Sequence, residues 1–199
     1  TQILVKDESP RFGLNAFKAL GGSYAIARCL GERLGLAESG LTFAALTAPE
    51  ARAKLGKCTF VTATDGNHGR GVAWAARLLG HDAVVYLPKG SAQERLNNIR
   101  AEGARAEITD LNYDDAVRWA SKQARQNGWI LVQDTAWPGY EIIPAWILQG
   151  YGTIALEIAD ELKKRCMAPP THVFLQAGVG SFAGSMLGSF ASLWGESAP

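Results

Sequence analysis

Short apolar runs alternate along this chain with longer stretches in which apolar residues recur at helical spacing. The apolar and β-branched runs predict strands, because such side chains pack well on a pleated surface. The predicted strands are residues 3–5, 59–63, 83–87, 104–108, 130–133 and 172–176. The helical spacing predicts helices over residues 15–36, 49–55, 67–79, 92–102, 113–126, 153–164 and 182–194.

The first long helix carries a signal at each end. Asn15 follows the turn residue Gly13 and is expected to cap the N-terminus of the helix. Gly35 suits its C-terminal end, where a residue in the left-handed conformation is common.

The alternation of apolar strands and helices indicates an α/β fold, in which helices cover both faces of a parallel sheet. Residues 59–134 are expected to form a compact four-stranded unit, and the flanking segments a second sheet that the chain leaves and re-enters. The expected domains are a large one from residues 1–36 and 139–199 and a small inserted one from residues 37–138. Because the chain begins inside a strand-like run, we interpret it as a segment of a longer protein.

Composition excludes some classes of function. Lys plus Arg number 20 and Asp plus Glu 19, so the net charge of +1 indicates neither a nucleic-acid nor a membrane partner. No secretory signal or membrane span is expected, since the apolar runs are short. The three cysteines form no CxxC or zinc pattern, so we expect no metal site and reduced thiols in the cytoplasm; they are Cys29, Cys58 and Cys166.

A glycine-rich loop, Gly178-Val179-Gly180-Ser181-Phe182-Ala183-Gly184, follows one predicted strand and opens a helix. Glycines let the backbone approach an anion, and the helix N-terminus offers free N–H groups, so a phosphate is the expected ligand. A tight strand–helix turn without a ligand is the alternative. The loop lacks the Gly-Lys-Ser/Thr of a Walker A motif and the spacing of a dinucleotide fingerprint.

A polar turn, Thr64-Asp65-Gly66-Asn67-His68-Gly69, lies at the end of another predicted strand. Ligands of parallel α/β sheets bind at such strand ends, so these side chains could bind a ligand or transfer protons. The alternative is an Asx-type turn that only caps the next helix, with His68 as a satisfied, partly buried histidine.

Lys18 falls in the first turn of the first long helix, after Asn15, Ala16 and Phe17. The helix dipole disfavours a cation at this end, and a neutral amine is a nucleophile. The alternative is an ordinary solvated surface lysine. Lys18, the polar turn and the glycine-rich loop together suit one ligand that carries an aldehyde, a phenolic oxygen and a phosphate.

These motifs, in this order, resemble those of the fold-type II pyridoxal-phosphate (PLP) enzymes, which include serine and threonine dehydratases, cysteine synthase and the tryptophan synthase β-chain. Within that group, three segments are most similar to the ammonia-lyases that act on 2,3-diaminopropionate, namely residues 6–18, 63–74 and 132–137. The resemblance covers essentially the whole chain. It implies two Rossmann-like parallel-sheet domains, the smaller inserted in the larger, and a homodimer.

The resemblance also implies a role for each motif. Lys18 forms the Schiff base with PLP, Phe17 packs beside it, and Asn67 hydrogen-bonds the phenolic oxygen of the ring. The donors to the phosphate are Gly178, Val179, Gly180, Ser181 and Phe182. The partner of the pyridine nitrogen lies later in the chain of such enzymes, after the last residue of this one.

Asp65 departs from most dehydratases, which carry a small uncharged residue at that position. We expect Asp65 and Lys18 on opposite faces of the cofactor, so that Asp65 removes the α-proton of D-2,3-diaminopropionate and Lys18 that of the L-enantiomer. Asp134 is expected to hold the β-ammonium of the substrate or to assist proton transfer to it. The products are pyruvate and two molecules of ammonia.

Two other interpretations stay open. One is a different fold-type II enzyme, such as a serine or threonine dehydratase. The neutral side-chain hydroxyl of its substrate, however, would offer the carboxylates of Asp65 and Asp134 no cation to bind. The other is a non-catalytic α/β module that binds a phosphorylated ligand, in which Lys18 is incidental.

Overall fold

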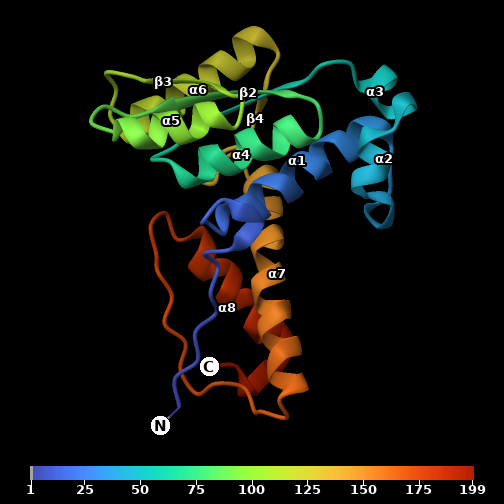
Figure 1. Cartoon of the computed structure of the whole chain (residues 1–199), viewed down its shortest axis with the longest axis vertical. Helices are drawn as coiled ribbons and strands as arrows, with labels where there is room; N and C mark the ends of the chain where they lie inside the picture. Colours follow the sequence, from blue (N-terminus) through green and yellow to red (C-terminus); the bar gives the residue numbers. More distant parts are fainter. Residues whose placement is uncertain (1) are drawn as a thin grey trace.

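A computed structural model describes residues 2–199 of the chain. A four-stranded parallel sheet lies in the upper part of Figure 1. It has the strand order β3-β2-β1-β4 and is made of β1 (Thr59–Ala63), β2 (Asp82–Leu87), β3 (Arg105–Ile108) and β4 (Ile130–Leu131). The connecting helices are α4 (Asn67–Leu78), α5 (Gln93–Ala101) and α6 (Tyr113–Asn127). The predicted four-stranded α/β unit is therefore confirmed, with element bounds that differ by a few residues.

The two faces of the sheet bury different helices, because successive side chains of a strand point to opposite sides. Phe60, Val85 and Leu87 belong to the core that includes α4 and α5. The other face packs on small residues of α6, which lets the helix lie close; the cluster is Val61, Ala63, Val84, Tyr86, Ala116, Ala120 and Ala124. Strands β1 and β2 are thus buried on both sides, as their continuous apolar runs predict, whereas the edge strand β3 exposes Arg105 and Glu107.

Helix α1 (Lys18–Leu34) lies between the sheet unit and the long helix α7 (Ile142–Lys164), with α2 (Phe43–Thr47) and α3 (Pro49–Leu55) beyond its C-terminal end (Figure 1). Gly35 ends α1 in the left-handed conformation, with φ 73°, as predicted. Glycines allow α1 and α7 to touch: a Cβ on Gly150 would lie 2.5 Å from the carbonyl oxygen of Leu20. Gly71 plays the same part between α4 and α1, where a Cβ would lie 2.8 Å from the Cα of Ala19.

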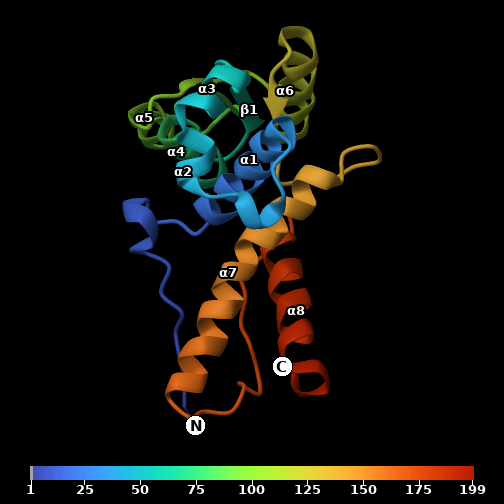
Figure 2. The same ribbon diagram turned by 90° about the vertical axis from the view of Figure 1, so that its right-hand side faces the viewer.

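Helix α7 and helix α8 (Ser181–Trp194) pack side by side in an arm that extends away from the sheet (Figure 2). By length and composition alone α7 could cross a membrane, with a mean hydropathy of 1.3 over 18 residues. This is weak evidence, because Trp146, Ile147 and Tyr151 of α7 are buried in the same core as α1. The absence of a membrane partner stays a prediction.

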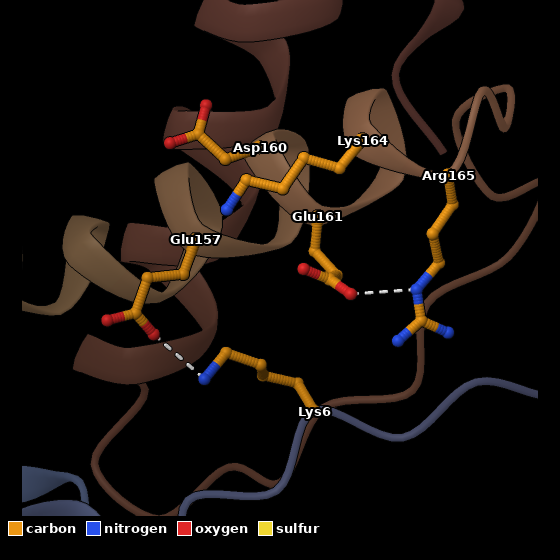
Figure 3. A pocket seen from close by; sticks show the side chains of 6 residues that line it. All are labelled: Lys6, Glu157, Asp160, Glu161, Lys164 and Arg165. Atoms are coloured by element: carbon orange, nitrogen blue, oxygen red, sulfur yellow. Dashed lines mark hydrogen bonds and ion pairs between the residues drawn. The ribbon is translucent and has the colours of Figure 1, made fainter.

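Ion pairs join the N-terminal segment to α7. The guanidinium of Arg11, in a short 3-10 turn (Arg11–Gly13), donates to both carboxylate oxygens of Glu157, at 2.8 and 2.6 Å. Figure 3 shows Lys6 of the same segment against Glu157, at 2.8 Å, in a shallow pocket of mixed charge. Hydrogen bonds from Arg11 and Lys6 lower the pKa of Glu157 to about 2.

Some predictions were wrong. Asn15 does not cap α1: the helix begins at Lys18 without a side-chain cap, and Asn15 has φ 55°, a left-handed conformation incompatible with an N-cap. Residues 3–5 and 172–176 form no strand, and Phe174 is 95% exposed. A strand needs a neighbour to pair with, and the described residues place none beside either segment. Helix α7 begins at Ile142 rather than at residue 153.

Replacing Gly150 with alanine tests the contact between α1 and α7. The added Cβ meets backbone atoms, which cannot rotate away, so the free energy of unfolding should fall by about 1–3 kcal/mol. Gly188, in α8, has no atom within 4 Å of its Cβ position. The control Gly188→Ala should leave stability unchanged or raise it by up to about 1 kcal/mol. Chemical denaturation measures both, and equal effects would contradict the close helix crossing.

Replacing Glu157 with glutamine tests the attachment of the N-terminal segment. Because the folded-state pKa of Glu157 lies below its ordinary value, its carboxylate stabilises the fold above about pH 4.5, and this contribution disappears as the pH falls towards 2. The carboxylate is 39% exposed, so solvent screening limits the loss in Glu157→Gln to about 1 kcal/mol at pH 7. The control Glu161→Gln removes only an exposed pair with Arg165. A difference between wild type and Glu157→Gln that persists at pH 2 would refute the assignment.

Candidate active site

The candidate site lies at the carboxyl end of the sheet, where β1 and β4 are neighbours. The buried side chain of Gln133 links them: its Oε1 accepts hydrogen bonds from the hydroxyl of Thr62 and the N–H of Ala63, both at 3.0 Å. The backbone of Gln133 is fixed too, because its N–H donates to the hydroxyl of Tyr140 at 2.8 Å. Residue 134 is therefore held beside the polar turn that follows β1.

Asp134 is the centre of the site. The residue is 2% exposed, and its Oδ2 lies 2.7 Å from the Nζ of Lys18, which comes from the far end of the sequence. Burial alone would raise the pKa of the Asp134 carboxyl, but His68 and Lys18 outweigh it and hold the pKa below its ordinary value. The site therefore contains a buried carboxylate whose main partner is an amine.

Lys18 lies in the first turn of α1, as predicted, although the helix begins at Lys18 itself rather than at residue 15; its side chain remains 31% exposed. The dipole at a helix N-terminus repels a cation, and the carboxylate of Asp134 compensates for this repulsion. Lys18 is thus neither a free surface lysine nor a buried one. Its amine is held at the edge of the sheet, where a ligand can reach it.

His68 is almost fully buried behind Asp134, on the first turn of α4. Its Nε2 lies 2.7 Å from the carbonyl oxygen of Val132, which can only accept, so Nε2 carries the proton. Its Nδ1 lies 4.0 Å from the Asp134 carboxylate and has no hydrogen-bond partner among residues 2–199. Burial lowers the pKa of His68, partly offset by Asp134. The alternative of a satisfied histidine therefore holds for Nε2 but not for Nδ1.

The polar turn does not use its Asx side chains for capping. The hydroxyl of Thr64 accepts from the N–H groups of Gly66 and Gly69, at 3.0 and 3.2 Å. The Asx-turn alternative is therefore wrong for Asp65 and Asn67: both are exposed, and no side-chain hydrogen bond is found for either within the described part of the chain. Gly66, with φ 152°, makes the turn possible. The two polar side chains are left available to a ligand.

Asp65 and Lys18 are not in contact: no ion pair joins them in the described structure. The phenol of Tyr113, on the first turn of α6, lies near both Asp65 and Asp134. Burial raises its pKa to about 12, with contributions from both carboxylates. The Nε2 of Gln133 donates to the Tyr113 hydroxyl at 3.3 Å. Tyr113 stands in no motif, and Gln133, although it lies in the segment 132–137, is given no role by the resemblance.

Helix α8 begins within the glycine-rich loop, at Ser181, and the preceding Gly180 has φ 92°. No side chain caps α8, and the first backbone bond of the helix runs from the N–H of Gly184 to the oxygen of Gly180. The N–H groups of residues 181–183 are thus left free for an anion. The hydroxyl of Ser181 donates to the carbonyl oxygen of Asp134 at 2.6 Å, which fixes the loop against the site. Gly178 and Val179 are exposed.

Phe17 lies between the lysine and this loop. Its ring centroid is 4.3 Å from that of Phe182 and 5.3 Å from that of Tyr151. The structure thus places Phe17, Lys18, Asp134, Ser181 and Phe182 together. Asp65 and Asn67 stand on the adjoining turn.

Several buried polar atoms of the site have no partner. Of the four such atoms found in residues 2–199, three belong to this region: the Nδ1 of His68, the Oγ1 of Thr135 and the hydroxyl of Tyr151. Buried polar groups are normally hydrogen-bonded, so this concentration indicates a site built for a polar ligand. An amine, an anion-binding helix terminus and free donors fit PLP. Among the described residues no cluster of metal-ligating side chains occurs.

Comparisons with known proteins agree with this geometry. The chain matches the family described as pyridoxal-phosphate dependent enzyme over residues 1–198. It is 59% identical over 197 residues to diaminopropionate ammonia-lyase from Salmonella typhimurium, covering 99% of this chain and 49% of the relative. The chain therefore spans about half the length of the curated relatives it matches.

Solved structures show the same relationship. Diaminopropionate ammonia-lyase from Escherichia coli in complex with D-serine superposes with a TM-score of 0.91 at 54% identity, covering 98% of this chain and 49% of that one. The processed form of threonine deaminase isoform 2 from Solanum lycopersicum shares the fold, with a TM-score of 0.64 at 22% identity over 95% of this chain and 45% of that one. From the family match over nearly its whole length, the chain belongs to the pyridoxal-phosphate-dependent enzymes.

Proposed function

We propose that this chain is the cofactor-holding part of an ammonia-lyase that converts 2,3-diaminopropionate and water to pyruvate and two molecules of ammonia. The observation that carries the proposal is the buried carboxylate of Asp134 beside the amine of Lys18, at 2.7 Å. A carboxylate at this place suits a substrate whose β-substituent is an ammonium. The 59% identity to a diaminopropionate ammonia-lyase supports the same substrate.

The cofactor would be held at both ends. Lys18 would bind its aldehyde carbon, Asn67 its phenolic oxygen, and the N-terminus of α8 its phosphate, through residues 178–182. Phe17 would pack beside it. When bound, PLP withdraws electrons from the α-carbon of the substrate, which makes the α-proton acidic.

The side chains of this chain then account for proton movement. The amine of Lys18 would take the α-proton of the substrate from one face. The carboxylate of Asp65 stands on a separate turn and is assigned the opposite face. Asp65 would therefore act on D-2,3-diaminopropionate and Lys18 on the L-enantiomer.

Asp134 has a different role in this proposal. Its carboxylate would hold the β-ammonium in place of the Lys18 ammonium, and would keep that leaving group protonated as the carbon–nitrogen bond breaks. The depressed pKa of Asp134 suits a group that remains an anion at neutral pH. The arrangement favours an ammonium leaving group over a hydroxyl.

A serine or threonine dehydratase is the second candidate, and its supporting observation is the fold shared with threonine deaminase. Side-by-side assays of 2,3-diaminopropionate and serine on the full chain decide between them. We expect turnover of diaminopropionate to exceed that of serine; faster turnover of serine would overturn the proposal. A homodimer in the cytoplasm is also proposed, from the family resemblance alone.

Replacing Asp65 with asparagine separates the two bases. The variant should lose about 100-fold or more of its activity on D-2,3-diaminopropionate, because a general base typically contributes 10²–10⁴-fold. Activity on the L-enantiomer should change little. A steady-state assay of pyruvate with each enantiomer measures this, with Asp110→Asn as an exposed control. Equal losses on both enantiomers would exclude a two-base mechanism.

Replacing Asp134 with asparagine tests the recognition of the β-ammonium. The ratio of kcat/KM for diaminopropionate to that for serine should fall at least about tenfold, because a buried charge-assisted contact is lost for only one substrate. Asp114→Asn changes an exposed carboxylate of α6 and is the control. If the ratio stays constant, Asp134 does not discriminate between leaving groups.

A further inference from the structure

The hydroxyl of Tyr151, in the middle of α7, is a buried donor without a partner. The residue is 0% exposed, and its hydroxyl forms no hydrogen bond to any of residues 2–199. Buried tyrosine hydroxyls normally find a partner, because leaving one unsatisfied costs free energy. An unsatisfied hydroxyl next to a candidate site therefore points to a ligand.

The ring of Tyr151 packs against two aromatic side chains next to the parts of the site that would hold the ends of the cofactor. One is Phe17, the residue before Lys18, with ring centroids 5.3 Å apart in an edge-to-face contact. The other is Phe182, the second residue of α8, with centroids 6.2 Å apart. Tyr151 thus contacts both the residue beside Lys18 and a residue of the first turn of α8.

The position of this ring is fixed by close packing. A Cβ on Gly21 would lie 2.6 Å from the Cε1 of Tyr151, so α1 leaves no room between the two. Burial raises the pKa of Tyr151, and the negative charge of Asp134 raises it further. The phenol therefore remains protonated at neutral pH, and it can donate a hydrogen bond to an anion but cannot act as a base.

Tyr140 shows what a satisfied buried tyrosine looks like in the same protein. Its hydroxyl accepts from the N–H of Gln133 at 2.8 Å and donates to the carbonyl oxygen of Leu131 at 3.0 Å. Tyr140 is therefore a structural residue, complete without a ligand. Tyr151 differs from it in having a hydroxyl without a partner, on a ring that contacts Phe182 of the first turn of α8.

We propose that Tyr151 is a cofactor ligand, whose hydroxyl donates a hydrogen bond to the phosphate held at the N-terminus of α8. Two independent observations support this assignment: no side chain caps the first turn of α8, and the hydroxyl of Tyr151 has no partner among residues 2–199. It deepens the proposed function by naming a phosphate ligand outside the glycine-rich loop. The assignment depends on the part of the proposed function that makes PLP the cofactor, and it does not depend on which substrate the enzyme uses.

The test compares Tyr151→Phe with wild type on the full chain, in two measurements. Thermal unfolding of the cofactor-free protein should show no loss of stability in the variant, because the removed hydroxyl has no partner there. Absorbance titration should show PLP binding weakened about tenfold or more, the loss of a hydrogen bond to a charged group. Binding of pyridoxal, which lacks the phosphate, should be unchanged.

Tyr140→Phe is the matched control. It removes a hydroxyl with two partners, so it should lower the unfolding temperature without a selective effect on PLP over pyridoxal. The inference is overturned if Tyr151→Phe binds PLP like wild type, weakens PLP and pyridoxal equally, or destabilises the cofactor-free protein as Tyr140→Phe does. A different result would overturn the proposed function alone: Tyr151→Phe weakens PLP binding selectively, but the PLP-loaded wild type shows no lyase activity.

Discussion

The ion pair between Lys18 and Asp134 is the interaction on which the site depends. Asp134 lies deep at the end of β4, and a buried carboxylate is costly unless it is paired. Lys18 supplies that partner from the start of α1, where the helix dipole disfavours its charge. Each residue thus compensates for the unfavourable position of the other. The pair also joins the sheet unit to α1. Helix α1 in turn packs closely on α7 through glycine contacts.

Buried polar groups surround this pair, and some of them lack hydrogen-bond partners among the described residues. Gln133, Thr62 and Tyr140 hold the ends of β1 and β4 with satisfied hydrogen bonds. Three other buried atoms, on His68, Thr135 and Tyr151, have none in the described residues. The satisfied groups make the site rigid, and the unsatisfied ones mark where a ligand supplies the missing partners. A site arranged before its cofactor arrives loses less conformational entropy on binding.

The sequence predicted the sheet unit well, because β1 and β2 are apolar on both faces and helices alternate with the strands. It also directed attention to Lys18, the polar turn and the glycine-rich loop, because their residues stand together in motifs; their roles stay predictions. It failed at Asn15, whose left-handed backbone is set by the preceding turn, and at residues 3–5 and 172–176, where apolar patterning predicts a strand but pairing requires a neighbour. The contributions of Tyr113, Gln133 and Tyr151 arise from contacts between distant segments, which periodicity cannot reveal.

The central claim is that Lys18 is the residue that binds the cofactor covalently, and reduction of the PLP-loaded chain with borohydride tests it most directly. Borohydride makes the bond between the cofactor and a lysine amine permanent, and peptide mass spectrometry then locates the modified residue. The account predicts the cofactor mass on the peptide that contains Lys18, and its loss in Lys18→Ala, whereas Lys54→Ala retains it. Modification of another lysine in wild type, or of none, would contradict the account.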